Sequence, residues 1–316
     1  MTRRTRARRA VSTPSDPGAG DGMSPRQPCP CGSGRRYKNC HGAGDVAVSR
    51  PFEGLPRECD WIALRELVPS ATAPLRLAGD EADRDVTLAT VLPLALPAIV
   101  RPDGRILLGL QVHARSGDVG RDLAYALEQA LQAEPGSMLS GGGRPGPGRR
   151  LQDLLDLSEP LDATLHGDFG FWLEAQTGQQ YSAEVQASME RANAAIVPTE
   201  RIAGLGAAYW CQIGDKAHVR WVMPQDEDEL LDGFARLAVR KELGLGSTAR
   251  YAGSFRAHGR LVPVWDVPGE STAAEWAEPA AAFGARLADA LAEPGPLPDP
   301  ARRARDGLRG RQLTLR

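Results

Sequence analysis

Three cysteines and a histidine near the start of the chain have types and a spacing that suit metal binding. Cys29, Cys31, Cys40 and His41 follow the pattern C-x-C-x8-C-H. Thiolates and imidazole are preferred ligands of Zn²⁺, and four of them complete its tetrahedral shell without leaving a position for water. We therefore predict a closed, structural Zn²⁺ site formed by these four residues.

The residues between these ligands suit a small knuckle around a metal ion. Pro30 fixes one backbone angle between the first two cysteines, and Gly32 and Gly34 permit the tight turn that follows. Three thiolates and a neutral imidazole leave one net negative charge on the bound ion, which the basic side chains of Arg35 and Arg36 should stabilise. A knuckle with so little core should be unfolded without metal.

The alternative interpretation is that these cysteines are ordinary residues or form disulfide bonds. The chain has five cysteines, and Cys59 and Cys211 stand far from the others. The arginine-rich start of the chain is followed by Ser, Pro, Asp and Gly rather than by the apolar core of a signal peptide. We therefore expect a cytoplasmic, reducing location in which clustered thiols bind metal, with the two isolated cysteines as small buried hydrophobic residues.

The segment CPCGSGRRYKNCHG at residues 29–42 resembles the SEC-C motif, the zinc knuckle at the carboxyl end of the preprotein translocase ATPase SecA. The resemblance implies zinc binding, and it implies docking to an export chaperone or to the ribosome. ATP-driven export is not supported, because the chain contains no G-x-x-x-x-G-K-[ST] sequence. The order of the chain, with the motif first and an Ala- and Arg-rich body after it, resembles an uncharacterised actinobacterial family with no known activity.

Charge is distributed unevenly along the chain. Residues 1–41 carry a net charge of plus seven and residues 301–316 plus five, whereas residues 42–300 carry minus fourteen. Basic arms bind phosphate backbones such as ribosomal RNA by counterion release. The alternative is that these ends are solvated tails that fold back on the acidic body.

The composition divides the chain into five parts. The longest apolar stretch, residues 87–100, contains Pro93 and Pro97 and is too short to span a bilayer, so we expect buried strands and no membrane span. The predicted parts are a disordered basic tail (1–28), the zinc knuckle (29–42), a linker (43–58), an α+β body of unknown function (59–293) and a second disordered basic tail (294–316).

Within the body, strand patterns joined by Gly-containing turns are followed three times by a helical pattern. This repetition predicts the α+β class, with an antiparallel sheet covered by helices on one face. The predicted hairpins span residues 94–113, 209–223 and 250–266, and the predicted helices span 118–132, 226–243 and 271–291, the last with a kink at Pro279.

Candidate catalytic residues in the body have simpler interpretations. His166-Gly167-Asp168 and Asp168-Phe169-Gly170 resemble two phosphotransferase triplets, but they share one aspartate where a kinase needs two separate acidic positions. We interpret this segment as a turn. The other conspicuous residues are predicted to be surface or capping histidines (His113, His218, His258), an acidic helix start (226–229) and core tryptophans (Trp210, Trp221, Trp265, Trp276).

Two functions remain. The first is a zinc-binding adaptor that docks a protein partner or the ribosome through its knuckle and basic arm, with RNA phosphates as further contacts. The second is an enzyme of unknown class in the α+β body, with the knuckle as a recruitment module. A deep polar pocket in the body would favour the enzyme, and an exposed aromatic patch would favour the adaptor.

Overall fold

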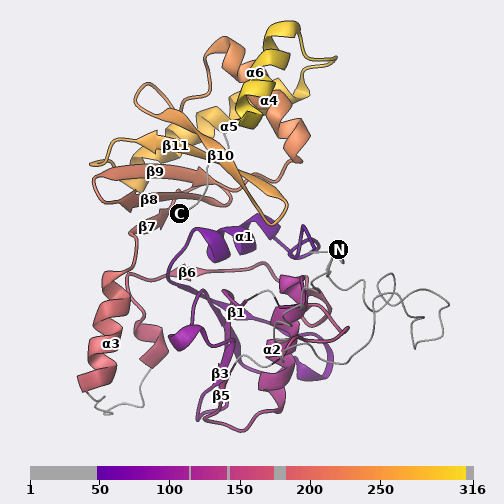
Figure 1. Cartoon of the computed structure of the whole chain (residues 1–316), viewed down its shortest axis with the longest axis vertical. Coiled ribbons are helices and arrows are strands. Elements are labelled where there is room, and N and C mark those ends of the chain that lie inside the picture. The colour runs from indigo at the N-terminus through magenta and orange to yellow at the C-terminus, as the bar shows by residue number, and fades with distance from the viewer. Residues whose placement is uncertain (1–47, 114, 141–142, 174–182, 311–316) are drawn as a thin grey trace, which may run out of the picture. The chain divides into compact units, whose positions relative to one another are not determined.

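The computed structural model describes residues 48–113, 115–140, 143–173 and 183–310 (Figure 1). The predicted tail at 1–28 and the zinc knuckle at 29–42 lie outside these ranges. The described helices are α1 (Glu58–Glu66), α2 (Val119–Gln132), α3 (Ala183–Ala194), α4 (Glu227–Arg240), α5 (Ala277–Ala292) and α6 (Asp299–Gly310).

The first sheet has the strand order β5-β3-β4-β2-β1-β6. Its neighbours pair antiparallel except β2 and β4, which are parallel. Pro74 in β1 is paired with Thr87 of β2 and lies beyond the two residues that pair with β6, so its missing N–H removes no ladder hydrogen bond. The strands are β1 (Ala71–Leu75), β2 (Val86–Ala89), β3 (Ala98–Val100), β4 (Ile106–Gly109), β5 (Met138–Leu139) and β6 (Thr164–Leu165).

The second sheet is antiparallel throughout, with the order β10-β11-β9-β8-β7. The turn between β10 and β11 has positive φ at both His258 and Gly259, the backbone of the hairpin turn that matches strand twist. The strands are β7 (Thr199–Arg201), β8 (Ala208–Ile213), β9 (Lys216–Trp221), β10 (Arg250–Ala257) and β11 (Arg260–Val267).

Both faces of the second sheet are buried. Trp210 and Trp265 pack with Phe234 of α4 and Phe283 of α5 on one face. The residues next to Trp210 and Trp265 in sequence point to the opposite face of this sheet. The core on that face also contains side chains of α1 and of the first sheet. In Figure 1, α1 lies between the two sheets. The side chains of this second face include Tyr209, Val222, Val262 and Val264.

Polar contacts also connect α1 to both sheets. Asp60 pairs with Arg201 of β7, and Glu66 Oε1 lies 2.8 Å from Nε2 of His258. On the other side, Arg65 donates to the carbonyl oxygens of Leu110 and Val112, just beyond β4. Helix α1 therefore forms polar contacts with both sheets and connects them.

The α+β class and the three hairpin-then-helix units are confirmed. Strands β3 and β4 precede α2, strands β8 and β9 precede α4, and strands β10 and β11 precede α5. The expectation of one sheet with helices on one face is wrong, because two sheets form and the second is covered on both faces. The predicted helix at 271–291 begins as the 3₁₀ helix Ala273–Trp276 and continues as α5, with Pro279 in the first turn of α5, where a proline is tolerated.

The end of the predicted linker belongs to the folded body. Phe52 is fully buried, and the carbonyl oxygen of Pro51 accepts hydrogen bonds from the side chains of Arg150 (3.0 Å) and Gln152 (2.8 Å). Residue 58 already begins α1. The remainder of the 43–58 segment, up to residue 47, lies outside the described residues.

The predicted tail at 294–316 contains helix α6. Ala301 and Leu308 of α6 are buried, and Arg305 donates to Asp228 of α4 at 2.9 Å. Arg305 also pairs with Asp232, and Arg309 pairs with Asp228. Residues 299–310 therefore fold back on the acidic start of α4, as the alternative interpretation of the basic ends proposed. None of the helices in the described ranges is both long and apolar enough to cross a lipid bilayer.

Candidate functional site

The predicted zinc ligands Cys29, Cys31, Cys40 and His41 lie outside the described residues. Within the described part of the chain, no group of three or more His, Cys, Asp or Glu side chains is arranged to hold a metal ion. The site that the structure does show is a pocket in the body.

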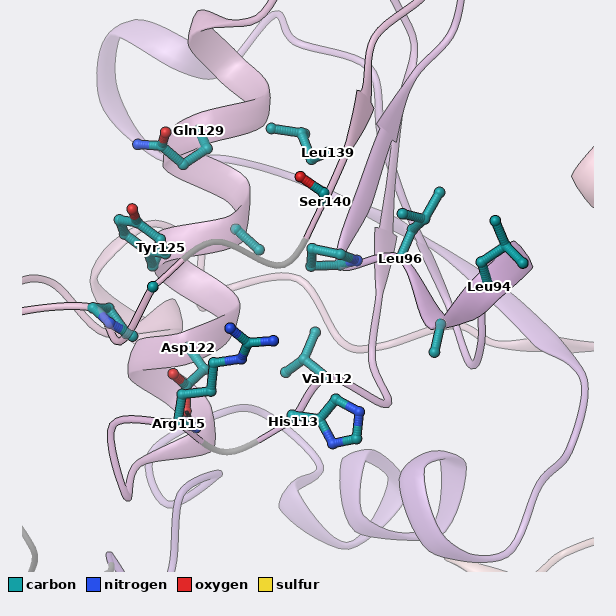
Figure 2. A pocket seen from close by; sticks show the side chains of 15 residues that line it. Leu94, Leu96, Val112, His113, Arg115, Asp122, Tyr125, Gln129, Leu139 and Ser140 are labelled. Carbon is teal, nitrogen blue, oxygen red and sulfur yellow. Dashed lines mark hydrogen bonds between the residues drawn. The ribbon is translucent and has the colours of Figure 1, made fainter. Parts of the chain in front are cut away.

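This pocket lies beside α2 and has a volume of about 420 Å³ (Figure 2). That volume is within the range of small-molecule sites, roughly 300–1,000 Å³. Much of its wall is apolar and is made by Leu94, Leu96, Pro97, Val112, Leu139 and Pro145. Its polar lining residues are His113, Arg115, Asp122, Tyr125, Gln129 and Ser140.

Asp122 holds the loop that carries Arg115. Its Oδ2 accepts from the backbone N–H of Arg115 at 3.0 Å and from the Ser116 hydroxyl at 3.0 Å, and its Oδ1 accepts from the Ser116 N–H at 3.1 Å. Burial raises the pKa of this carboxyl group above its ordinary value, against the opposing effect of these hydrogen bonds. Both carboxylate oxygens of Asp122 thus accept hydrogen bonds from residues 115 and 116 of the loop.

The turn at the rim of the pocket has an unusual backbone. Leu94 and Ala95 have φ values of 56° and 53°, and the N–H of Leu96 donates to the carbonyl oxygen of Pro93 at 3.1 Å. Positive φ at both central residues is the geometry that favours Asn-Gly, not Leu-Ala. The Leu94 side chain is also 91% exposed, so the chain holds a strained, solvent-facing leucine at the edge of a cavity.

Relief of this strain should stabilise the protein. We expect Leu94→Gly and Ala95→Gly each to raise the free energy of unfolding by about 0.5–1 kcal/mol, because a left-handed residue with a Cβ costs roughly 1–2 kcal/mol and the added backbone entropy of glycine offsets part of the gain. Differential scanning calorimetry should show midpoints higher by about 1–4 °C. A fall in the midpoint for both variants would contradict the assigned backbone.

The histidines differ in their surroundings. His113 is exposed and lines the pocket. His218 and His258 are mostly buried and contact Asp266 (3.2 Å) and Glu66 (2.8 Å), so the expectation of surface or capping residues is wrong for these two. Burial is the main cause that lowers the pKa of His218, and the nearby Arg220 adds to it against the opposing effect of Asp266.

The phosphotransferase-like segment forms a turn, as expected. Asp168 accepts from the N–H of Gly170 at 2.8 Å, and the short 3₁₀ helix Gly170–Leu173 follows. His166 Nε2 lies 2.8 Å from the hydroxyl oxygen of Thr72 in β1. These contacts give the segment a structural role at the edge of the first sheet.

The two isolated cysteines have no features of a nucleophile. Burial raises the pKa of Cys59 to about 11, and it also raises the pKa of Cys211, which is fully enclosed in β8. A thiol that stays protonated reacts slowly. Of the core tryptophans, Trp210, Trp265 and Trp276 are buried as predicted, and Trp221 is half-buried.

The pocket could not be predicted from the sequence, although one of its lining residues, His113, is conspicuous there. Its walls come from residues 94–97, 112–115, 122–129 and 139–145, and no motif connects these segments. Only the exposed apolar residues between Pro93 and Pro97 give a local signal, and the sequence pattern assigned them to buried strands.

Comparison with known families gives one match at the start of the chain and one over the body. Residues 26–43 match the SEC-C motif. Residues 51–316 match a family of unknown function, DUF5926, and this match includes both Phe52 and helix α6. No solved structure matches the chain. The chain therefore belongs to the DUF5926 family and carries a SEC-C motif ahead of the family's domain.

Proposed function

We propose that the chain is a cytoplasmic, zinc-binding adaptor that docks a protein partner or the ribosome through its SEC-C motif. The observation that carries this proposal is the motif match at residues 26–43, which contains the complete ligand set Cys29, Cys31, Cys40 and His41. SEC-C motifs generally bind zinc, and a closed tetrahedral site has no open position for catalysis.

The charges around the motif support a nucleic-acid-rich partner such as the ribosome. Residues 1–41 carry a net charge of plus seven, and such arms gain affinity for RNA through counterion release. Two arginines of α6, Arg305 and Arg309, differ from those of the arm, because they are paired with a carboxylate of α4. The amino-terminal arm is therefore the proposed phosphate contact.

An enzyme in the body is the second candidate, and the pocket beside α2 is the observation that favours it. The pocket brings His113, Arg115 and Asp122 to one cavity. Asp122, however, is occupied by the backbone of residues 115 and 116. The pocket therefore supports binding of a small molecule more directly than catalysis.

Ribosome association of the full chain tests the adaptor proposal. We expect the chain to sediment with ribosomes at low salt, and we expect replacement of Arg3, Arg4, Arg6, Arg8 and Arg9 by glutamine to weaken this association. The logarithm of the association constant falls linearly with the logarithm of the salt concentration. Loss of five phosphate contacts should make this negative slope less steep by up to about four.

The matched control is Arg305→Gln with Arg309→Gln, which also removes positive charge but from residues already paired with α4. This control should sediment like the unaltered chain. Equal sedimentation of both variants and the unaltered chain would reject the arm as a ribosome contact, and failure of the unaltered chain to sediment at low salt would reject the ribosome as partner.

A further inference from the structure

We propose that residues 311–316 of the chain dock in an apolar groove between α1 and α5, with Leu313 and Leu315 against its wall. This inference goes beyond the proposed adaptor function, because it gives the body an internal peptide-docking site. It rests on the lining of the groove, on the place where α6 ends and on the sequence of the segment that follows.

The groove has a volume of about 480 Å³, and most of its lining is apolar. Its walls come from the start of α1, from the segment after β9 and from α5. Trp221 and Leu291 pack against the second core but are only half-buried, and Ala288 is exposed. An apolar group that covered these side chains would remove their surface from water. The apolar lining residues include Trp221, Met223, Leu287, Ala288 and Leu291.

The charged side chains of the groove are paired with one another. Glu58 Oε2 accepts from Nη2 of Arg260 at 2.9 Å, and Asp60 Oδ2 lies 3.3 Å from Nε of Arg57. A charged group that entered the groove would lose hydration without gaining an ionic partner. The part of an occupant that enters the groove should therefore be uncharged.

Gln225 adds a polar position to the lining. Its side-chain oxygen is buried and accepts no hydrogen bond from any residue in the described ranges. A buried acceptor without a donor costs free energy, and a backbone N–H of an extended segment is a suitable donor. The groove thus fits an uncharged peptide better than a hydrocarbon.

Helix α6 ends next to this groove. Arg309, in the last turn of α6, pairs with Asp228 in the first turn of α4. Just before α4, Asp226 lies 3.4 Å from Nη1 of Arg260, and the same Nη1 donates to the carbonyl oxygen of Pro224. Pro224 and Arg260 both line the groove. The chain therefore leaves α6 close to the rim of the groove.

The segment after α6 has the sequence that the groove requires. Four uncharged residues lie between the two arginines at 311 and 316, and they are Gln312, Leu313, Thr314 and Leu315. Alternate side chains of an extended chain share a face, so both leucines can face the groove while Gln312 and Thr314 face water.

The length of the segment is sufficient as well. Six residues reach up to about 20 Å when extended. Helix α5 lines the groove from Gly284 to Leu291, over about 11 Å along the helix axis. Residues 311–316 can therefore pass the rim at Pro224 and follow α5 along the groove.

Alkylation of Cys59 by N-ethylmaleimide in the full chain tests the proposal, because Cys59 lines the groove and is half-buried. Peptide mass spectrometry separates it from the other cysteines. Leu313→Asp with Leu315→Asp should raise its alkylation rate by about 10-fold or more, since burial of one leucine side chain shifts an equilibrium by roughly 10- to 100-fold. Equal Cys59 rates in this variant and the unaltered chain would overturn the proposal.

The matched control is Gln312→Asp with Thr314→Asp, which adds the same charge at the outward positions. It should change the Cys59 rate less than about twofold, and a rise equal to that of the leucine variant would overturn the proposal. The buried Cys211 reports unfolding and should react equally slowly in all three chains.

Disulfide trapping locates the segment without the charged variants. Leu313→Cys and Leu315→Cys are oxidised separately in the otherwise unaltered chain. At least one should form a disulfide with Cys59 at a rate independent of chain concentration, which requires Cα atoms about 4.4–6.8 Å apart, whereas Thr314→Cys should form none. Absence of this disulfide at both leucine positions would overturn the proposal. A rate that rises with concentration would assign the groove to a second copy of the chain and overturn it too.

Discussion

Glu58→Ala is expected to lower the free energy of unfolding by about 2–3 kcal/mol, a large effect for a single charged residue. Glu58 Oε2 accepts from Nη2 of Arg50 at 2.7 Å and from Nη2 of Arg260 at 2.9 Å. The side chains of Glu58 and Arg260 are only 12% and 11% exposed. Loss of the carboxylate would leave two guanidinium groups at this position without their shared partner.

Urea denaturation of the full chain, followed by circular dichroism, measures this effect. Glu53→Ala is the matched control, because Glu53 contacts the same Arg50 at 2.7 Å but is 60% exposed. An exposed pair contributes little, so the control should lose less than about 1 kcal/mol. Equal losses for the two variants would show that burial of Glu58 does not determine its contribution.

The same residue should make the stability depend on pH. Burial alone would raise the pKa of Glu58, but hydrogen bonds and charge interactions from Arg50 and Arg260 outweigh it and lower the pKa below the ordinary 4.5. A lowered folded-state pKa stabilises the protein above the unfolded-state value, and this contribution is lost as the pH falls through the folded-state pKa. The difference between the unaltered chain and Glu58→Ala should therefore shrink below about pH 4.5.

The hairpins and helices of the body could be predicted because their signals are local. The turn at His258-Gly259 and the acidic first turn of α4 each lie within a few residues of the element that they define. Helix α6 gave no comparable signal. Its composition is that of a charged tail, and its partners on α4, Asp228 and Asp232, are remote in sequence.

The linker prediction was wrong beyond residue 47, and the pocket was not predicted at all, for the same reason. Residues 51–58 have the Pro and Gly content of a linker, yet Phe52 is buried by contacts with segments far along the chain. The pocket likewise brings together four separate stretches, of which Arg115 and Leu94 have no distinctive sequence context. Tertiary contacts of this kind leave no spacing rule in a single sequence.

Cys31→Ser and Cys40→Ser are each expected to reduce the zinc content of the full chain from one ion to nearly none after dialysis against a chelator. A serine hydroxyl is a poor zinc ligand at neutral pH, and the free energy of zinc binding in such small modules, about 10–16 kcal/mol, depends on the complete set of ligands. The body is expected to stay folded, because its described residues have hydrophobic cores of their own.

Zinc analysis and circular dichroism of the same samples measure both parts of this expectation. Cys59→Ser is the matched control, since Cys59 lies in α1 and should not affect the metal. Retention of zinc by both knuckle variants would contradict the ligand assignment. Unfolding of the whole chain in either variant would show that the knuckle and the body share one core.

Zinc K-edge X-ray absorption on the full chain tests the central claim most directly. The account predicts one zinc ion per chain with three sulfur ligands at about 2.3 Å and one nitrogen ligand at about 2.0–2.1 Å. A chain purified without zinc, or a bound ion with oxygen ligands in place of these sulfurs, would contradict it.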